Sequence, residues 1–520
     1  MKSQLTRREF LKSIGTLSLL PHLQQVSALN LDGKTRDPGQ PNIILILFDA
    51  LSAYNLSLYG YPRKTSPNLE RFASRSSVYH NHHSAANFTT PSTASLFTST
   101  YPWEHRAITL TGLIRDEIKP NNLFKLLGEK YYQAAFTQNV YADMLLYQFD
   151  QYIDQHLAPD DFSLIGNTFY DNLSGGDAIY GLKGFDQFLF RREEAHGSLF
   201  LSILSDINTM LGVQINNEKL KEMHPHGIPR LANTDVYFLF SQVMDGVMDM
   251  LGKLPAPYFS YIHLLPPHSP YMPTSQFLDT FDDGWAPEMK KFHKLGTRVS
   301  EQKIDFLRQR YDEFVANLDY EFGRLLDHLE TSGALEASYV IFTSDHGELF
   351  ERGTHGHSTP LLFEPVIRVP LIISSPGQEQ RKDIHTLTSN VDILPTLAQI
   401  SGLPVPEWAK GEVLPGFDIQ VNPDRSVWVL EAKKNQSWGE LKKASLGLLE
   451  ADQKLVYYHG YKHYQDKYEF YNLENDPEEL DNQYKSSPIA EEMQAELDWK
   501  FETIKHQSHI MPGKSSQDDS

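Results

Sequence analysis

Residues 42–49 read NIILILFD, a nearly unbroken apolar run that ends in a carboxylate. A run without polar alternation is typical of a strand buried on both faces of a parallel sheet. A second run, YVIFT at 339–343, leads into Ser344-Asp345-His346-Gly347, and a third, VPLII at 369–373, has the same character. We therefore predict three buried strands, two of which end in groups able to bind a metal ion.

The sequence between these runs predicts helices. Apolar residues recur at helical spacing over 304–331, directly before the second strand, and residues 385–403 indicate a loop followed by a helix. A helix followed by a strand implies α/β crossovers, so Asp49 and Asp345 should both lie at the carboxyl edge of a sheet. In open α/β sheets that edge is where ligands bind.

A hydroxyl-rich stretch, NFTTPSTASLFTST at 87–100, predicts a further helix that begins beside this edge. Pro91 suits the first turn, with Thr89 or Thr90 at the cap. The positive end of the helix dipole stabilises an alkoxide or a bound oxyanion, so a cap residue there can also be a nucleophile. Together with Asp49, Asp345 and His346, the hydroxyl of Thr89 would complete a site for one divalent cation, Ca²⁺, Mg²⁺, Mn²⁺ or Zn²⁺.

Length and composition narrow the class of protein. A chain of 520 residues predicts a large α/β domain with a smaller partner. Its net charge of −20 argues against nucleic acid or an anionic membrane as the main partner. An anionic substrate stays open, because a bound metal reverses the sign of a local site. The absence of cysteine excludes disulfides, thiolate zinc sites and a cysteine nucleophile, and no pattern sets an oligomeric state.

The N-terminus carries an export pattern. Residues 6–12, TRREFLK, form a twin-arginine motif, which a short apolar run and the cleavage candidate Val26-Ser27-Ala28 follow. We expect 1–28 to be a twin-arginine signal peptide, 29–41 a linker, and the protein to be periplasmic or extracellular. No later stretch approaches ~20 apolar residues, so we expect no transmembrane helix in the mature chain.

The pattern changes again near residue 406. Short strand-like pieces occur at 427–430 and 454–457, and a polar helical pattern follows near 488–505. These features predict a smaller α+β subdomain over 406–505 and a disordered tail over 506–520. Residues 150–235 carry no motif, and we interpret them as an elaboration around the site.

Several segments together resemble the sulfatase family of the alkaline phosphatase superfamily. They include NIILILFDALSAYNLSLYGYPRKTSPNLERFA at 42–73, YIHLLPPHSPYMP at 261–273, VIFTSDHGELFERGTHGHS at 340–358 and YEFYNLENDPEELDN at 468–482. The resemblance implies an α/β fold, the alkaline phosphatase-like three-layer sandwich with a large mixed, mostly parallel sheet. It also implies a catalytic domain over 42–405 and an anionic phosphate or sulfate ester as substrate.

The same resemblance implies roles for individual residues. It makes Asp49, Asp345 and His346 metal ligands, together with Thr89, which takes the nucleophile position. It places His268 against the ester, and His355 and His357 around the sulfate or phosphate. If residues 355–357 are extended, both of these last rings point to one face.

Two departures separate this chain from the usual sulfatase pattern. The nucleophile motif is Thr89-Thr90-Pro91-Ser92-Thr93, whereas sulfatases carry Cys or Ser-x-Pro-x-Arg. Threonine cannot be oxidised to formylglycine, so we expect none. Ala50 follows Asp49 where many sulfatases have a second carboxylate. Both departures resemble the threonine-nucleophile branch that includes phosphoethanolamine transferases and lipoteichoic acid synthases.

Other polar residues have simpler interpretations. His263 lies inside an apolar run, which favours a structural role, and Glu348 is interpreted as a solvated helix start. The cluster of His80, His82 and His83 is interpreted as solvated. Asn87 and Lys64 are weaker candidates for contact with the anion.

Three functions are compatible with these residues. The first is cleavage of a phosphate ester or phosphodiester by a metal-activated Thr89, with transfer to water or an alcohol. The second is hydrolysis of a sulfate ester without formylglycine. The third is a non-catalytic envelope protein that binds a head group or partner through the same site.

Overall fold

The computed structural model describes residues 37, 39–164, 219–231, 236–417, 422–465 and 467–506. The predicted signal peptide, most of the predicted linker and nearly all of the predicted tail lie outside the described residues, and the domain boundaries stay predictions. Within the described part, no helix combines the length and the apolar character needed to cross a bilayer.

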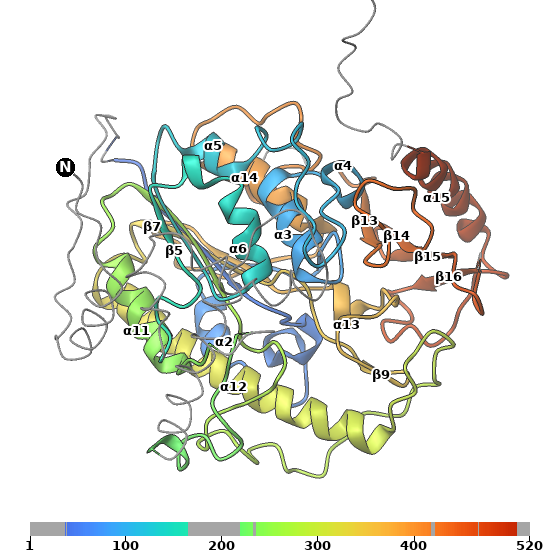
Figure 1. Cartoon of the computed structure of the whole chain (residues 1–520), viewed down its shortest axis with the longest axis horizontal. Coiled ribbons are helices and arrows are strands. Elements are labelled where there is room, and N and C mark those ends of the chain that lie inside the picture. The colour runs from blue at the N-terminus through green and yellow to red at the C-terminus, as the bar shows by residue number, and fades with distance from the viewer. Residues whose placement is uncertain are drawn as a thin grey trace, which may run out of the picture. The chain divides into compact units, whose positions relative to one another are not determined.

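The largest element is an eight-stranded sheet (Figure 1). Its strands, in spatial order, are β11 (Lys382–Ile384), β2 (Ser77–Tyr79), β10 (Leu371–Ser374), β7 (Ser338–Thr343), β1 (Asn42–Phe48), β6 (Tyr258–Leu264), β4 (Tyr132–Thr137) and β5 (Gln155–Leu157). All neighbouring pairs are parallel except those of β10, which runs antiparallel to both β7 and β2. The predicted mixed, mostly parallel sheet is thus confirmed.

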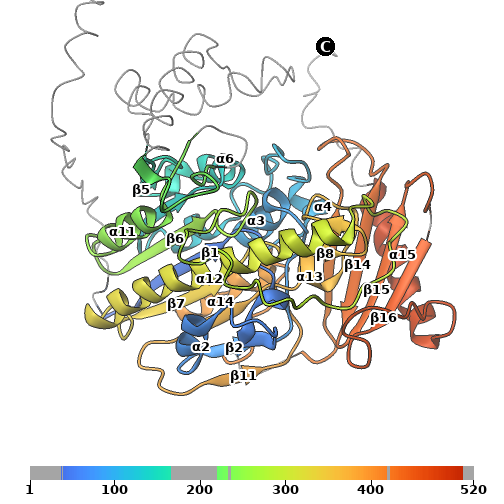
Figure 2. The same ribbon diagram turned by 90° about the horizontal axis from the view of Figure 1, so that it is seen from below.

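Helices cover both faces of this sheet, which makes three layers. One face packs against α2 (Pro67–Ala73), α11 (Phe240–Leu251) and α12 (Glu301–Thr331), and Figure 2 shows α12 running along it. The other face packs against α3 (Thr89–Thr98), α5 (Leu123–Leu127), α6 (Val140–Tyr147) and α14 (Ile393–Ile400). Alternate side chains of β1 enter the two cores, which is why its residues 43–48 are all apolar.

The register of the central strands brings the candidate residues to one edge. Leu47 of β1 lies opposite both Thr343 of β7 and His263 of β6, and His263 lies opposite Thr137 of β4. Two residues beyond Leu47, Thr343 and Thr137 the chain places an Asp, an Asp and an Asn. Because side chains alternate along a strand, residues two positions apart lie on the same face. These polar groups therefore follow the strands on the face that α3 covers.

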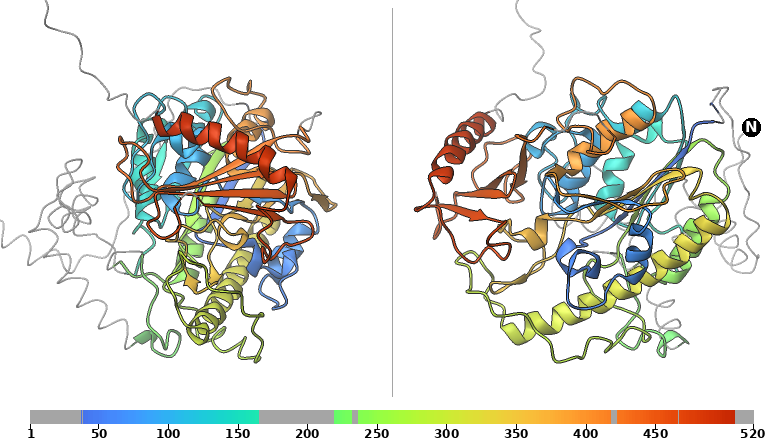
Figure 3. Two further views of the ribbon diagram at one scale, coloured as in Figure 1. Left: turned by 90° about the vertical axis from the view of Figure 1, so that its right-hand side faces the viewer. Right: turned by 180° about the vertical axis from the view of Figure 1, so that it is seen from behind.

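A second, four-stranded antiparallel sheet lies at the C-terminus (Figure 3). Its strands are β13 (Ser426–Glu431), β14 (Ala444–Glu450), β15 (Gln453–His459) and β16 (Lys467–Asn472). One face packs against α15 (Pro488–His506), and the other against apolar residues of the segment 361–367, which contains α13 (Glu364–Ile367). The predicted smaller α+β unit is therefore present.

Five further short elements lie near the site. The pair β3 (His82–His83) and β12 (Thr388–Ser389) is parallel, and the hairpin β8 (Phe350–Glu351) and β9 (Thr354–His355) is antiparallel. The short helix α4 (Pro102–His105) follows α3. One expectation needs correction: the strand at 369–373 is buried but antiparallel to its neighbours. The helix expected after a loop within 385–403 is present and begins at Ile393.

Candidate active site

Two buried carboxylates face each other at the edge of the large sheet. Asp49 and Asp345 are both fully buried, and Asp49 Oδ1 and Asp345 Oδ2 have no hydrogen-bond partner among the residues that the structure describes. Burial, and then repulsion by Asp345, raise the pKa of Asp49 well above its usual value. Ala50, in left-handed backbone conformation, turns the chain here and donates its N–H to Asp345 Oδ1.

His346 presents a nitrogen lone pair to these carboxylates. Its Nδ1 lies 2.9 Å from the carbonyl oxygen of Gly347, and because a carbonyl only accepts, Nδ1 carries the proton. The unprotonated Nε2 then lies 3.5 Å from Asp49 Oδ1 and 3.4 Å from Asp345 Oδ2. Burial lowers the pKa of His346 to about 4, so the ring is neutral at pH 7. A lone pair and two carboxylate oxygens that converge without a donor group of the described chain between them fit a bound cation.

His263 belongs to the same cluster, which corrects its interpretation as a structural residue. Its Nε2 lies 3.7 Å from Asp49 Oδ2 and 3.8 Å from Asp345 Oδ2, and it has no hydrogen-bond partner. Ligand atoms of Asp49, His263 and Asp345 all lie within 4.8 Å of one another. The hydroxyl of Tyr261, 2.9 Å from Nδ1, can donate or accept, so both tautomers of His263 fit.

Thr89 lies at the start of α3 and points into this cluster. The helix begins at Thr89 itself with Phe88 as the cap residue, so the prediction that Thr89 or Thr90 is the cap is wrong by one residue. Thr89 is 4% exposed, and its Oγ1 lies 3.4 Å from His346 Nε2. The neighbouring Thr90 points elsewhere, since its hydroxyl donates to the carbonyl of Leu110.

Asn139 completes the surroundings of Thr89 and was missed in the sequence. Its Nδ2 donates to Asp49 Oδ2 and, at 3.2 Å, to Thr89 Oγ1. Its Oδ1 accepts the N–H of Tyr141 and so caps α6. The signal that identifies it is an Asn placed between a strand and a helix start, but β4 carries too few apolar residues to be recognised as a strand.

His268 and His357 line the other side of His346. The ring centroid of His357 lies 4.3 Å from that of His346 and 4.9 Å from that of His268. His268 Nδ1 lies 2.7 Å from the carbonyl of Ser269, and His357 Nδ1 lies 2.8 Å from Glu348 Oε2. Both rings therefore keep the Nδ1 proton and present a free Nε2, and burial lowers the pKa of each.

Glu348 organises both histidines of the His-x-His segment. It is 1% exposed, which overturns its interpretation as a solvated residue. Its Oε1 accepts the hydroxyl of Tyr271, which in turn lies 3.0 Å from His355 Nε2. His355 therefore contacts Tyr271 while His357 joins the cluster, because β9 ends at His355 and the segment is not extended beyond it. The prediction that both rings share one face was conditional on an extended segment, and that condition is not met beyond His355.

Three further residues can now be placed. His82 and His83 are fully buried and contact Thr388 and Glu364, so the solvated interpretation is wrong for them. Asn87 is also buried, and its Nδ2 donates to the carbonyls of His357 and Thr359 rather than facing the cluster.

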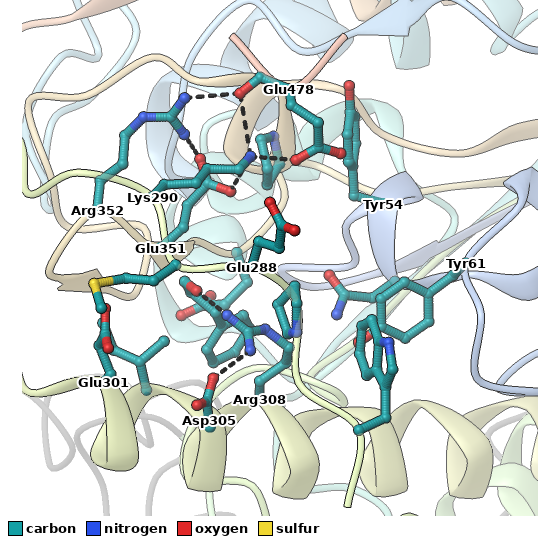
Figure 4. Close-up of a pocket in the computed structure, with 18 of the residues that line it drawn as sticks. Tyr54, Tyr61, Glu288, Lys290, Glu301, Asp305, Arg308, Glu351, Arg352 and Glu478 are labelled. Carbon is teal, nitrogen blue, oxygen red and sulfur yellow. Dashed lines mark hydrogen bonds and ion pairs between the residues drawn. The ribbon is translucent and has the colours of Figure 1, made fainter. Parts of the chain in front are cut away.

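A cavity of about 330 Å³ adjoins the cluster and shares Glu348 with it (Figure 4). Its charges are largely paired, as for Lys290, whose Nζ lies 2.7 Å from Glu351 Oε2 and 2.5 Å from Glu478 Oε2. Thr89 does not line it. We therefore assign the candidate chemistry to the cluster, where a hydroxyl, two unpaired carboxylates and free imidazole nitrogens meet, and not to this cavity.

Comparison with known proteins shows the family to which the chain belongs. The profile of the family described as Sulfatase matches residues 41–403, and that described as N-sulphoglucosamine sulphohydrolase, C-terminal, matches residues 353–507. Choline-sulfatase of Rhizobium meliloti (strain 1021) is 24% identical over 467 residues, covering 85% of this chain and 82% of that protein. Arylsulfatase of Clostridium perfringens (strain 13 / Type A) is 21% identical over 478 residues, covering 87% and 92%.

Solved structures share the fold. The phosphonate monoester hydrolase of Agrobacterium radiobacter has a TM-score of 0.62 at 17% identity, covering 90% of this chain and 96% of that one. The corresponding enzyme of Silicibacter pomeroyi has a TM-score of 0.61 at 17% identity, with the same coverage. The matched range 41–403 takes in every strand of the large sheet and the whole cluster at its edge. The chain therefore belongs to the sulfatase family and is a hydrolase of the alkaline phosphatase superfamily.

Proposed function

We propose that this protein cleaves a phosphate ester or phosphodiester by attack of Thr89 Oγ1, with the help of a divalent metal ion. The observation that carries the proposal is the position of that hydroxyl, 3.4 Å from the lone pair of His346 Nε2 and beside two buried, unpaired carboxylate oxygens. A threonine that only capped the helix would have no reason to lie against such groups.

Asp49, Asp345 and His346 would hold the cation together with Thr89, and His263 is a further candidate ligand. Hard oxygen ligands with imidazole suit Ca²⁺, Mg²⁺, Mn²⁺ or Zn²⁺. When bound, such an ion supplies Lewis-acid polarisation of the ester and favours the alkoxide of the threonine. The side-chain amide of Asn139 donates a hydrogen bond to Thr89 Oγ1. This bond fixes the orientation of the threonine hydroxyl.

The chain's own groups then account for the proton transfers. The hydroxyl proton of Thr89 passes to a free Nε2 of His268 or His357 as its oxygen bonds to phosphorus. The bond from phosphorus to the leaving alcohol breaks, and the same imidazole returns the proton to that alcohol. The phosphothreonine is cleared by water or a second alcohol in a reversal of these steps. Glu348 keeps His357 in the required tautomer.

The experiment compares Thr89→Ala with Thr90→Ala as a matched control, because Thr90 carries the same hydroxyl one residue away but bonds Leu110. We expect Thr89→Ala to lose at least about 10³-fold in kcat, since the covalent route disappears, and Thr90→Ala to stay active. Rapid quenching of the unsubstituted enzyme should yield a phosphate adduct on Thr89 by mass spectrometry. Undiminished turnover by Thr89→Ala would refute the proposal.

Sulfate-ester hydrolysis by the same unmodified hydroxyl is the second candidate. The match of residues 353–507 to the C-terminal profile of a sulphohydrolase favours it. Parallel assays with an aryl sulfate, a phosphate monoester and a phosphodiester separate the two, and sulfate release far above phosphate release would select the second. A non-catalytic envelope role is disfavoured by membership of a hydrolase family.

We further propose export by the twin-arginine pathway, supported by the TRREFLK motif at 6–12. Replacing Arg7 and Arg8 by lysine should leave the precursor in the cytoplasm of a host with a working pathway. Equal export of the lysine variant would contradict this assignment.

A further inference from the structure

A basic loop lies between β13 and β14 of the C-terminal sheet. Residues 432–443 read AKKNQSWGELKK and carry four lysines and one glutamate, in a chain whose net charge is −20. The loop is held in shape by Asn435, whose Oδ1 accepts the N–H groups of Lys442 and Lys443. Its Nδ2 donates to the carbonyls of Ala432 and Lys443.

Arg106 fastens this loop to the catalytic domain. It follows α4 directly, is 3% exposed, and donates to the carbonyls of Ser437 at 2.7 Å and Gly439 at 2.6 Å. The loop is thus anchored beside α3, the helix that begins at Thr89. An anchored loop presents its side chains at fixed positions, which a binding residue requires.

Lys433 of this loop lies beside the cluster that contains Thr89 and His357. Its Nζ donates to Ser358 Oγ at 2.6 Å and lies 5.1 Å from the ring centroid of Phe88. Ser358 follows His357, and Phe88 precedes Thr89, so Lys433 contacts the chain neighbours of both groups. Ser358 itself is exposed, which places the ammonium at the solvent side of the site and not among the buried carboxylates.

The charge of Lys433 is only partly balanced, because Glu431 favours its ammonium form without forming an ion pair with it. Within the described part of the chain, Lys433 Nζ forms no ion pair, and the nearby Glu431 bonds instead to Tyr461 and to the backbone N–H of Lys433. Lys433 is nevertheless half-buried, which lowers its pKa, and its field contributes to the lowered pKa of His357. A partly desolvated cation that has no ion-pair partner within the described part of the chain gains from an anion that approaches from solvent.

We propose that Lys433 binds a second anionic group on the organic part of the substrate. The inference rests on the proposed function of Thr89 and adds the substrate class. The alcohol released carries a carboxylate, sulfate or phosphate near the scissile ester, and Lys433 holds that group while Thr89 faces the ester. The C-terminal subdomain thereby contributes to specificity, and Lys433 is a substrate-binding residue.

The test compares Lys433→Gln with Lys434→Gln, a matched control that removes the same charge from the adjacent, exposed lysine. Binding is measured by calorimetry with two stable phosphonates, benzylphosphonate and 4-carboxybenzylphosphonate. Kinetics follow on nitrophenyl esters with and without a ring carboxylate. We expect Lys433→Gln to weaken binding, and to raise KM, about tenfold for the carboxylated compounds alone, with kcat unchanged. Lys433→Arg should retain most of the preference, and raising the salt concentration should reduce it.

The outcomes separate this inference from the proposed function. Equal effects of Lys433→Gln on both members of each pair, or an equal effect of Lys434→Gln, would overturn the role of Lys433. Absence of Thr89-dependent turnover would instead overturn the proposed chemistry. In that case calorimetry would still measure whether the protein binds 4-carboxybenzylphosphonate more tightly than benzylphosphonate. A loss of kcat alone would assign Lys433 to the reacting group and refute the second anionic subsite.

Discussion

Acidification below pH 6.5 should destabilise this protein through His105, a fully buried residue of α4. Its Nδ1 accepts the N–H of Ala107 at 3.1 Å, so the ring proton lies on Nε2, which is 3.0 Å from Ser95 Oγ on α3. A second proton on Nδ1 would break the bond from Ala107 and place a charge in the core. Burial accordingly lowers the pKa of His105 to about 3.

The size of the effect follows from the two pKa values. The pKa of His105 in the folded protein lies below its unfolded value of 6.5. The neutral ring therefore contributes fully to the free energy of unfolding above pH 6.5, and this contribution is lost as the pH falls towards 3. In that window each pH unit removes about 1.4 kcal/mol. Between pH 7.5 and 5 the loss sums to about 2 kcal/mol.

Urea unfolding of the parent and of His105→Asn at pH 7.5 and pH 5 tests this loss of stability. Its amide oxygen can still accept the N–H of Ala107 but cannot be protonated. The fall in unfolding free energy between pH 7.5 and 5 should be about 2 kcal/mol smaller in His105→Asn than in the parent. The exposed His463→Asn is the control and should keep the parent's pH dependence. Equal pH dependence in His105→Asn and the parent would refute the reasoning.

Three further outcomes are expected. Chelation of divalent ions should lower the melting temperature of the parent by several degrees, because the buried carboxylates lose their counter-ion. Asp345→Asn should show no such shift in the same thermal melt. An unchanged melting temperature of the chelated parent would contradict the metal site. Glu348→Gln should reduce kcat about 10- to 100-fold with little change in unfolding, because His357 loses an ionised acceptor, and parental kcat would exclude that role. Lys454→Met should cost about 3–5 kcal/mol in urea unfolding, since it leaves Glu364, 3.0 Å from the ammonium, without its cation; a loss below about 1 kcal/mol would argue against this ion pair as a stabilising contact.

The central strands and their terminal carboxylates were predictable from local sequence. The runs that became β1 and β7 are almost entirely apolar, as expected of strands covered on both faces, and Asp49 and Asp345 follow them. The long helix, two of the C-terminal strands and the C-terminal helix also followed from periodicity. Thr89 was found from its helix start, although the helix begins one residue earlier than a threonine cap would place it.

Asn139 and His263 could not be assigned in the same way. The strand before Asn139 reads YQAAFT, and its polar Gln133 is buried only because it bonds the carbonyls of Phe124 and Tyr152. His263 looks like one residue of an apolar run, and its role depends on β6 lying next to β1. Burial of Glu348 likewise depends on partners that lie far away or beyond a hairpin.

Local composition thus specified which segments become strands and which chemical groups stand at their ends. The order of the strands, and hence which side chains meet, came from packing across long sequence separations that no single segment encodes. Asp49, Asn139 and Asp345 are up to 296 residues apart in the chain. They converge because parallel strands in register end at one edge, and that register is fixed by the two cores on either side of the sheet.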